Sequence, residues 1–181
     1  MMAFVKRSEM KNKSLPEFEN LTTPEDLIKL AETRGLETNP VNVSQVANEL
    51  GISLRFEPMS NDDSGSLKKD RKTGVWVMTV NSLHHPHRQR FTIAHEIAHR
   101  VRHAANSDTF EDKTFFRNGD SNWMETEANQ FAAALLMPEA IFSEYIENVS
   151  DVVEDVAAHF HVSSMAVRIR AKVLGYEGHN L

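Results

Sequence analysis

One pentapeptide, His-Glu-Ile-Ala-His at residues 95–99, limits what the middle of this 181-residue chain can fold into. Two histidines four positions apart share a face only if the segment is helical, because four residues make slightly more than one α-helical turn. On such a helix both imidazoles can bind one ion. Glu96, about a quarter turn away, can reach a water beside that ion without becoming a ligand. This spacing predicts a zinc peptidase site with a glutamate as general base.

Chance offers a second interpretation of the motif, since the chain contains nine histidines. The same segment could be an ordinary amphipathic helix whose core stripe is formed by Phe91, Ala94, Ala98 and Val101, with surface histidines beside it. However, both histidines border this apolar stripe, and the surrounding residues are helix formers. We therefore favour the metal site.

A third ligand has to come from another segment, and it cannot be a thiolate because the chain has no cysteine. The best candidate lies in a second apolar helix expected over residues 121–137. There Glu125 and Asn129 are one turn apart, so they could supply a carboxylate to the metal and an amide that orients a ligand. Glu127 points roughly 200° away from Glu125, so both cannot easily bind the same ion. Either glutamate could instead be a solvated charge favoured by the helix dipole.

The rest of the chain predicts an α+β fold with three parts. Residues 1–20 lack periodicity and predict a flexible tail, residues 21–149 a catalytic core, and residues 150–181 a helix-turn-helix-like segment packed on that core. Alternating apolar residues predict strands near 52–56 and 74–80, in a small antiparallel or mixed sheet. Helices are expected near residues 24–34, 42–50, 87–104, 121–137, 138–147, 151–160 and 163–174, with an irregular loop over 105–120.

Charge and hydropathy argue against nucleic-acid binding and against a membrane-spanning or secreted protein. The formal net charge of −6 argues against broad nucleic-acid binding, which depends on cationic side chains. The helix expected over 163–174 carries Arg168, Arg170 and Lys172, but four acidic residues outnumber these three between positions 151 and 177. A packing or substrate-docking role therefore suits this segment better than DNA binding. No run is apolar enough for a membrane span or a signal peptide, so we expect a soluble, cytoplasmic protein.

Three segments together resemble one known family. The sequences RQRFTIAHEIAH at 88–99, ETEANQFA at 125–132 and LLMP at 135–138 are similar to those of the ImmA/IrrE metallopeptidases, and the similarity extends over roughly residues 25–175. This resemblance implies a thermolysin-like, or zincin-like, catalytic core and a cytoplasmic location in bacteria or their mobile elements. It also implies that Glu125 completes a zinc site with His95 and His99.

The resemblance further implies the activity, which is site-specific cleavage of a helix-turn-helix transcriptional repressor. We expect Zn²⁺ as the cofactor, although Mn²⁺ also fits the ligand types, and Glu96 as the general base. The strand expected over 75–80 could bind the substrate by strand addition if it lies at a sheet edge. The alternative is a non-proteolytic, regulatory or toxin-like module that sequesters a repressor or antitoxin, or binds DNA, and keeps zinc as a structural ion. The sequence does not reveal the oligomeric state.

Overall fold

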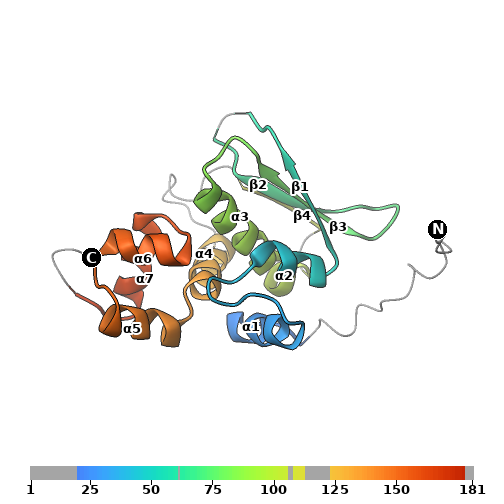
Figure 1. Ribbon diagram of the computed structural model, residues 1–181. Helices are drawn as coiled ribbons and strands as arrows, with labels where there is room; N and C mark the ends of the chain where they lie inside the picture. Colours follow the sequence, from blue (N-terminus) through green and yellow to red (C-terminus); the bar gives the residue numbers. More distant parts are fainter. Residues whose placement is uncertain (1–19, 61, 106–107, 113–122, 178–181) are drawn as a thin grey trace, which may run out of the picture.

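The computed structural model describes residues 20–60, 62–105, 108–112 and 123–177 (Figure 1). Within them the chain forms seven α-helices, one short π-helical segment and one four-stranded mixed sheet. The expected α+β class with a small mixed sheet is confirmed. The flexible tail expected over residues 1–20 lies almost entirely outside the described residues.

Two short helices precede the sheet, and each begins at a side chain that caps it. Helix α1 (Pro24–Thr33) begins with a capping box: the Thr23 hydroxyl accepts from the Asp26 N–H, and the Asp26 carboxylate accepts from the Thr23 N–H. Helix α2 (Val43–Glu49) begins at Asn42, whose side-chain oxygen accepts from the Gln45 N–H. Both helices bury an apolar face in the core.

The sheet has the strand order β1-β3-β2-β4. Strand β1 (Ile52–Glu57) runs parallel to β3 (Trp76–Asn81), β2 (Gly65–Lys69) pairs antiparallel with β3, and β4 (Thr109–Asp112) pairs antiparallel with β2. Leu67 faces Met78 in the register, and both side chains are fully buried. The central strands β2 and β3 therefore contribute side chains to the hydrophobic core.

Two details of this sheet differ from the sequence-based expectations. Strand β3 is hydrogen-bonded on both sides, so the expectation that residues 75–80 could accept a substrate strand is wrong. The region expected to be an irregular loop, 105–120, contains strand β4 at Thr109–Asp112. Its four residues are too few for a periodic pattern to stand out in the sequence. Among the described strands, β1 and β4 lie at the two edges of the sheet, and β3 lies inside it.

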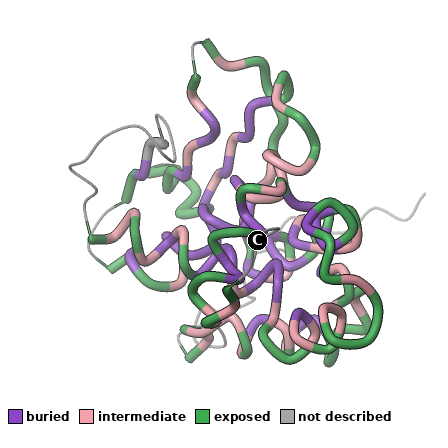
Figure 2. Tube along the Cα trace, turned by 90° about the vertical axis from the view of Figure 1, so that its left-hand side faces the viewer, coloured by how far each residue is buried: buried purple, intermediate pink, exposed green. Residues whose placement is uncertain are grey.

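Helix α3 (Pro86–Ala98) packs between the sheet and helix α4 (Trp123–Leu136), and it continues into the π-helical segment η3 (His99–His103) (Figure 1). Every residue from Thr92 to His99 is buried. Buried residues concentrate at the centre of the molecule, whereas the outer turns of the helices and the strand connections are exposed (Figure 2). The motif helix is therefore the central element of the fold.

Three helices follow α4 and lie together at one side of the molecule: α5 (Glu139–Asn148), α6 (Val153–Phe160) and α7 (Ser164–Val173) (Figure 1). Buried Arg170 on α7 donates from Nε to the Met137 carbonyl at the end of α4, at 3.0 Å. Tyr176 donates its hydroxyl hydrogen to Ser143 Oγ on α5, at 2.8 Å. These bonds attach the C-terminal helices to α4 and α5. None of the helices in the described part of the chain has both the length and the apolar composition needed to cross a membrane.

Candidate metal centre

The start of helix α3 is fixed to the end of strand β3 by one glutamine. Gln89 Nε2 lies 3.3 Å from the Asn81 carbonyl oxygen, 3.2 Å from that of Ser82 and 2.9 Å from that of His84. The buried Asn81 side chain in turn donates to the Asp63 carbonyl at 2.8 Å and accepts from the Leu83 N–H at 3.0 Å. These bonds satisfy backbone groups where the strand ends, and they fix the position of the motif helix relative to strand β3.

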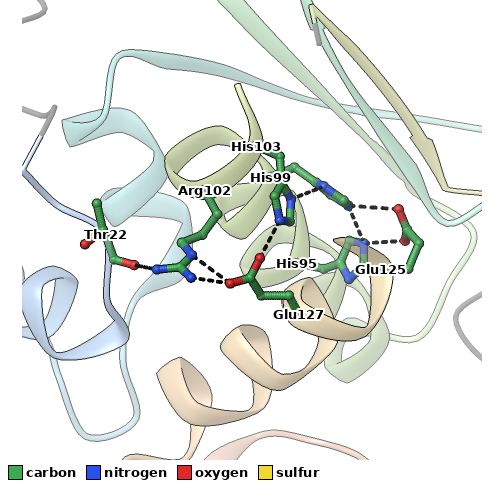
Figure 3. A network of polar contacts seen from close by, with 7 residues as sticks. All are labelled: Thr22, His95, His99, Arg102, His103, Glu125 and Glu127. Carbon is green, nitrogen blue, oxygen red and sulfur yellow. Dashed lines mark hydrogen bonds and ion pairs between the residues drawn. The ribbon is translucent and has the colours of Figure 1, made fainter. Parts of the chain in front are cut away.

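His95, His99 and Glu125 converge at one point between helices α3 and α4 (Figure 3). His95 Nε2 lies 2.9 Å from His99 Nε2 and 3.2 Å from Glu125 Oε2, and His99 Nε2 lies 3.3 Å from Glu125 Oε1. Among the described residues, this is the one group of three or more potential metal ligands whose ligand atoms all lie within 4.8 Å of one another.

These separations fit a small tetrahedral ion. Two atoms bound to zinc at about 2.0–2.1 Å and at a tetrahedral angle are roughly 3.3 Å apart. The two contacts between imidazole nitrogens and the Glu125 carboxylate, at 3.2 and 3.3 Å, are close to that value. Two imidazole nitrogens and one carboxylate leave a fourth position for water, as in catalytic zinc sites. The donor types and their spacing therefore fit zinc.

Asn129 orients one of the two imidazoles. Its Oδ1 lies 2.9 Å from His95 Nδ1. An amide oxygen can only accept, so His95 donates from Nδ1 and its Nε2 lone pair faces the ion position. The prediction that Glu125 and Asn129 form one functional pair on α4 agrees with this geometry, in which the carboxylate faces the centre and the amide supports a ligand.

The electrostatics of the centre favour a bound cation. Burial alone would raise the pKa of the Glu125 carboxyl, but its hydrogen bonds to His95 and His99 outweigh burial and the net pKa is lowered. Burial lowers the pKa of the His99 imidazole, so this ring favours its neutral form. A neutral imidazole and an ionised carboxylate are the forms that bind metal. The Glu125 side chain is 38% exposed, so the centre is open to solvent on the α4 side.

Glu96 lies on the same helix as the two histidines and is fully buried. Strand β2 begins against it: a Cβ added at Gly65 would lie 3.6 Å from Glu96 Oε1, 2.6 Å from Thr92 Cγ2 and 2.9 Å from the Thr79 carbonyl oxygen. Only glycine fits between helix and sheet at this position. The carboxylate expected to be the general base is therefore held where β2 meets α3.

The edge strand β4 also contacts the centre. Phe110 stacks on the His99 ring, with 4.6 Å between ring centroids and 16° between planes. Phe110 is opposite Leu67 in the β2–β4 register, and both are buried. Stacking restricts rotation of the His99 ring, and it places β4, an outer strand of the sheet among the described residues, next to the candidate ligands.

The structure brings three further residues to this centre. Buried His103 contacts His99, and Glu127 contacts both His103 and Arg102 (Figure 3). Glu127 was expected to point away from the metal, and it is not among the three converging ligands. His103 continues the stripe of His95 and His99 one turn on, so the sequence offers it either as a neighbour of the site or as an exposed residue, whereas the contacts of Arg102 and Glu127 leave no such signal.

The HExxH helix and a carboxylate from a second helix are the features of a metallopeptidase domain, and sequence comparison agrees with that class. A family described as the IrrE N-terminal-like domain, a peptidase family, matches residues 47–172. That range is well over half of the chain, and the chain therefore belongs to this family.

Three relatives illustrate the similarity. The radiation response metalloproteases IrrE of Deinococcus radiodurans and Deinococcus deserti are 35% identical over 106 residues and 37% identical over 98 residues, respectively. These matches cover 58% and 53% of this chain but only 30% and 33% of the relatives, so the chain spans about a third of their length. An uncharacterized immunity region protein 2 of Bacillus phage phi105 is 28% identical over 136 residues, which cover 74% of this chain and 82% of that protein.

One solved structure is similar in fold. It is a Mycobacterium tuberculosis transcriptional regulator, with a TM-score of 0.59 over 87% of this chain and 48% of that chain. The sequence identity is 17%. This similarity therefore concerns the arrangement of elements alone.

Proposed function

We propose that this protein is a zinc-dependent endopeptidase that cuts a protein substrate at a specific site, with His95, His99 and Glu125 as metal ligands and Glu96 as general base. The observation that carries the proposal is that ligand atoms of His95 and His99, which flank Glu96 in the sequence, and of Glu125 on α4 all lie within 4.8 Å of one another. We also propose that residues 21–149 form a zincin-like catalytic core. Residues 150–181 would form a helix-turn-helix-like segment packed on that core.

A zinc ion held by these ligands would supply Lewis acidity to the scissile carbonyl and to the attacking water. Glu96 would take the proton of the attacking water at a carboxylate oxygen and later return it to the leaving amine nitrogen. His95 and His99 would hold the ion through Nε2. Both imidazoles are buried, whereas the half-buried Glu125 leaves a side of the centre open for water and substrate to enter.

We infer that the substrate is a helix-turn-helix transcriptional repressor that adds a strand to β4. Strand β4 is the outermost strand on its side of the sheet in the described part of the chain, and it carries Phe110 against His99. Family membership supports a protein substrate, and similarity to a phage immunity-region protein supports a regulator of transcription as that substrate. A repressor substrate requires a cytoplasmic location.

Substitution of Glu96 by Gln tests this proposal most directly. Glutamine is nearly isosteric but cannot accept the proton, so we expect zinc content and folding to persist while cleavage falls at least 10²–10⁴-fold. The assay incubates purified protein with a helix-turn-helix repressor encoded next to its gene, with and without chelator, and follows fragments by mass spectrometry. Glu147→Gln, an exposed position on α5, is the matched control and should cleave like the wild type.

The competing function is a regulatory, toxin-like or DNA-binding module with a structural zinc ion. It predicts that Glu96→Gln relieves repression as well as the wild type does, with the repressor intact. Buried Arg170 bonds to the Met137 carbonyl, so one of the three cations of α7 serves packing rather than phosphate binding. Helix α7 also exposes Met165, Ile169 and Val173. An apolar surface of this kind favours a protein partner over nucleic acid.

A further inference from the structure

A line of polar contacts leads from His99 away from the metal centre (Figure 3). His99 Nδ1 lies 2.9 Å from His103 Nδ1, and His103 Nε2 lies 2.7 Å from Glu127 Oε2. Arg102 contacts the other Glu127 oxygen through Nε, at 3.0 Å, and through Nη2. Arg102 Nη1 also donates to the Thr22 carbonyl, at 3.3 Å, just before α1.

The hydrogens along this line can have only one arrangement that suits metal binding. A carboxylate only accepts, so His103 donates from Nε2 to Glu127. A neutral His103 then has an acceptor at Nδ1, and the adjacent Nδ1 of His99 must be the donor. The remaining lone pair of His99 is on Nε2, the atom that faces His95 and Glu125.

We propose that His103 and Glu127 are positioning residues: through their hydrogen bonds they hold His99 in the Nδ1–H tautomer, with its Nε2 lone pair on the metal. The inference rests on the proposed metal site and extends it by one layer. Neither residue touches the ion. His99 is thus supported by an imidazole that ends on a carboxylate, whereas His95 is supported by the neutral amide of Asn129.

The local backbone geometry explains how two imidazoles can meet in this way. In an α-helix, side chains four residues apart are offset by roughly 40° around the axis. The segment His99–His103 is π-helical, with a wider turn, and His103 is its fifth residue, four positions after His99. Side chains at this spacing lie on the same side of the turn, so the His103 ring can meet that of His99 as the His99 ring meets that of His95. Such turns occur frequently at functional sites.

A purely structural role is the competing explanation for these contacts. The side chains of Arg102 and Glu127 are 38% and 29% exposed, and an ion pair of this kind contributes little to stability. His103, however, is fully buried, and both of its ring nitrogens have partners. A structural role predicts lower stability of the variants with unchanged metal affinity and unchanged His99 tautomer. The positioning role predicts changes in both.

The experiment compares His103→Leu with His103→Gln in the full-length protein. Leucine fills the space but leaves His99 Nδ1–H without an acceptor. Glutamine keeps the polarity, because its amide oxygen can accept from His99 and its NH₂ can donate to Glu127. Glu127→Gln removes the charge at the end of the line, and Glu147→Gln on α5 is the control. Zinc affinity is measured by chelator competition, and the His99 tautomer by long-range ¹H–¹⁵N NMR of the metal-free protein.

We expect His103→Leu to lower zinc affinity 10- to 100-fold and to depopulate the Nδ1–H tautomer of His99. His103→Gln should recover most of both properties. Glu127→Gln should lower the affinity less than His103→Leu, and the control should match the wild type. Co²⁺ substitution should show an altered visible spectrum in the leucine variant only.

Two results would overturn the inference, and they differ in what they say of the site itself. If the wild type binds zinc, His99→Ala loses it, and both His103→Leu and Glu127→Gln keep wild-type affinity and tautomer, the metal site stands but the positioning role is wrong. If the wild type binds no zinc, the proposed function and the inference both fail. Should His103→Leu not fold, the same comparison between Glu127→Gln and its control still decides.

Discussion

The contact between Gly65 and helix α3 gives a stability prediction that can be worked out from distances. Gly65→Ala would add a Cβ 2.6 Å from Thr92 Cγ2 and 2.9 Å from the Thr79 carbonyl oxygen. Both distances are shorter than real Cβ contacts, so either the helix or the sheet must shift. Because Thr92 lies one turn before Glu96, the strain falls on the motif helix itself.

Two opposing effects set the magnitude. Overpacking a well-packed interior costs about 1–3 kcal/mol. Replacing glycine by alanine restricts the unfolded chain, which returns about 0.4–1 kcal/mol where the backbone suits alanine. The strain is larger, so we expect a net loss of roughly 1–2 kcal/mol. In a protein of this size that loss lowers Tm by about 2–8 °C.

Thermal and urea unfolding of the metal-free protein measure this loss, and a second substitution identifies its cause. Thr92→Ser removes Cγ2 but keeps the hydroxyl that donates to the Arg88 carbonyl, at 3.0 Å. In the Gly65→Ala/Thr92→Ser double variant we expect partial recovery, because the contact with the Thr79 carbonyl remains. A Tm for Gly65→Ala equal to or above that of the wild type would refute the close approach of β2 to α3. Additive losses in the double variant would place the strain elsewhere.

Three further predictions concern the ligands, the first helix and the C-terminal helices. His95→Ala and His99→Ala should each remove stoichiometric zinc, and Glu125→Gln should weaken its binding; full occupancy by mass spectrometry of the native protein would exclude the assignment. Thr23→Ala should cost about 1 kcal/mol in urea unfolding. Hydrogen bonds from Thr23 lower the pKa of Asp26 in the folded protein. The ionised carboxylate therefore stabilises the fold at pH values above its unfolded pKa of 3.8, and this stabilisation is lost as the pH falls through the folded pKa. The loss of unfolding free energy in Asp26→Ala should accordingly become smaller in acid. Arg170→Ala should cost about 1.5–3 kcal/mol, because it leaves the Met137 carbonyl without its charged donor, and unchanged stability would argue against tight packing of α7 on α4.

Local patterns were sufficient to predict the helices and the positions of the candidate ligands. The four-residue spacing of His95 and His99 and the one-turn spacing of Glu125 and Asn129 each depend on a single helix, whose period is fixed by its backbone hydrogen bonds. What remained open was whether the two helices would meet. That contact depends on the packing of α3 against α4, which no local spacing reports.

The sheet was harder to predict for the same reason. Parallel pairing of β1 with β3, and insertion of β2 between β3 and β4, are non-local choices. A strand such as β3, with buried Trp76, Met78 and Val80, reads the same in sequence at an edge as in the centre. Strand order nevertheless determines which strand can receive a substrate. The strand order excludes β3 and leaves β1 and β4 as edges, and the stacking of Phe110 on His99 is what favours β4 as the proposed substrate-binding strand.

Glu127 shows that the angular position of a residue on its own helix does not predict its contacts with other helices. Its offset of roughly 200° from Glu125 correctly predicts that the two carboxylates do not converge on one ion. The same offset says nothing about His103, which lies four positions after His99 in the π-helical segment and contacts Glu127 at 2.7 Å. A glutamate that faces away from one ligand can therefore still act on the site through the other. Residue roles in a metal centre follow from hydrogen-bond connectivity as well as from distance to the ion, and this connectivity depends on how α3 and η3 pack against α4, which the sequence pattern does not reveal.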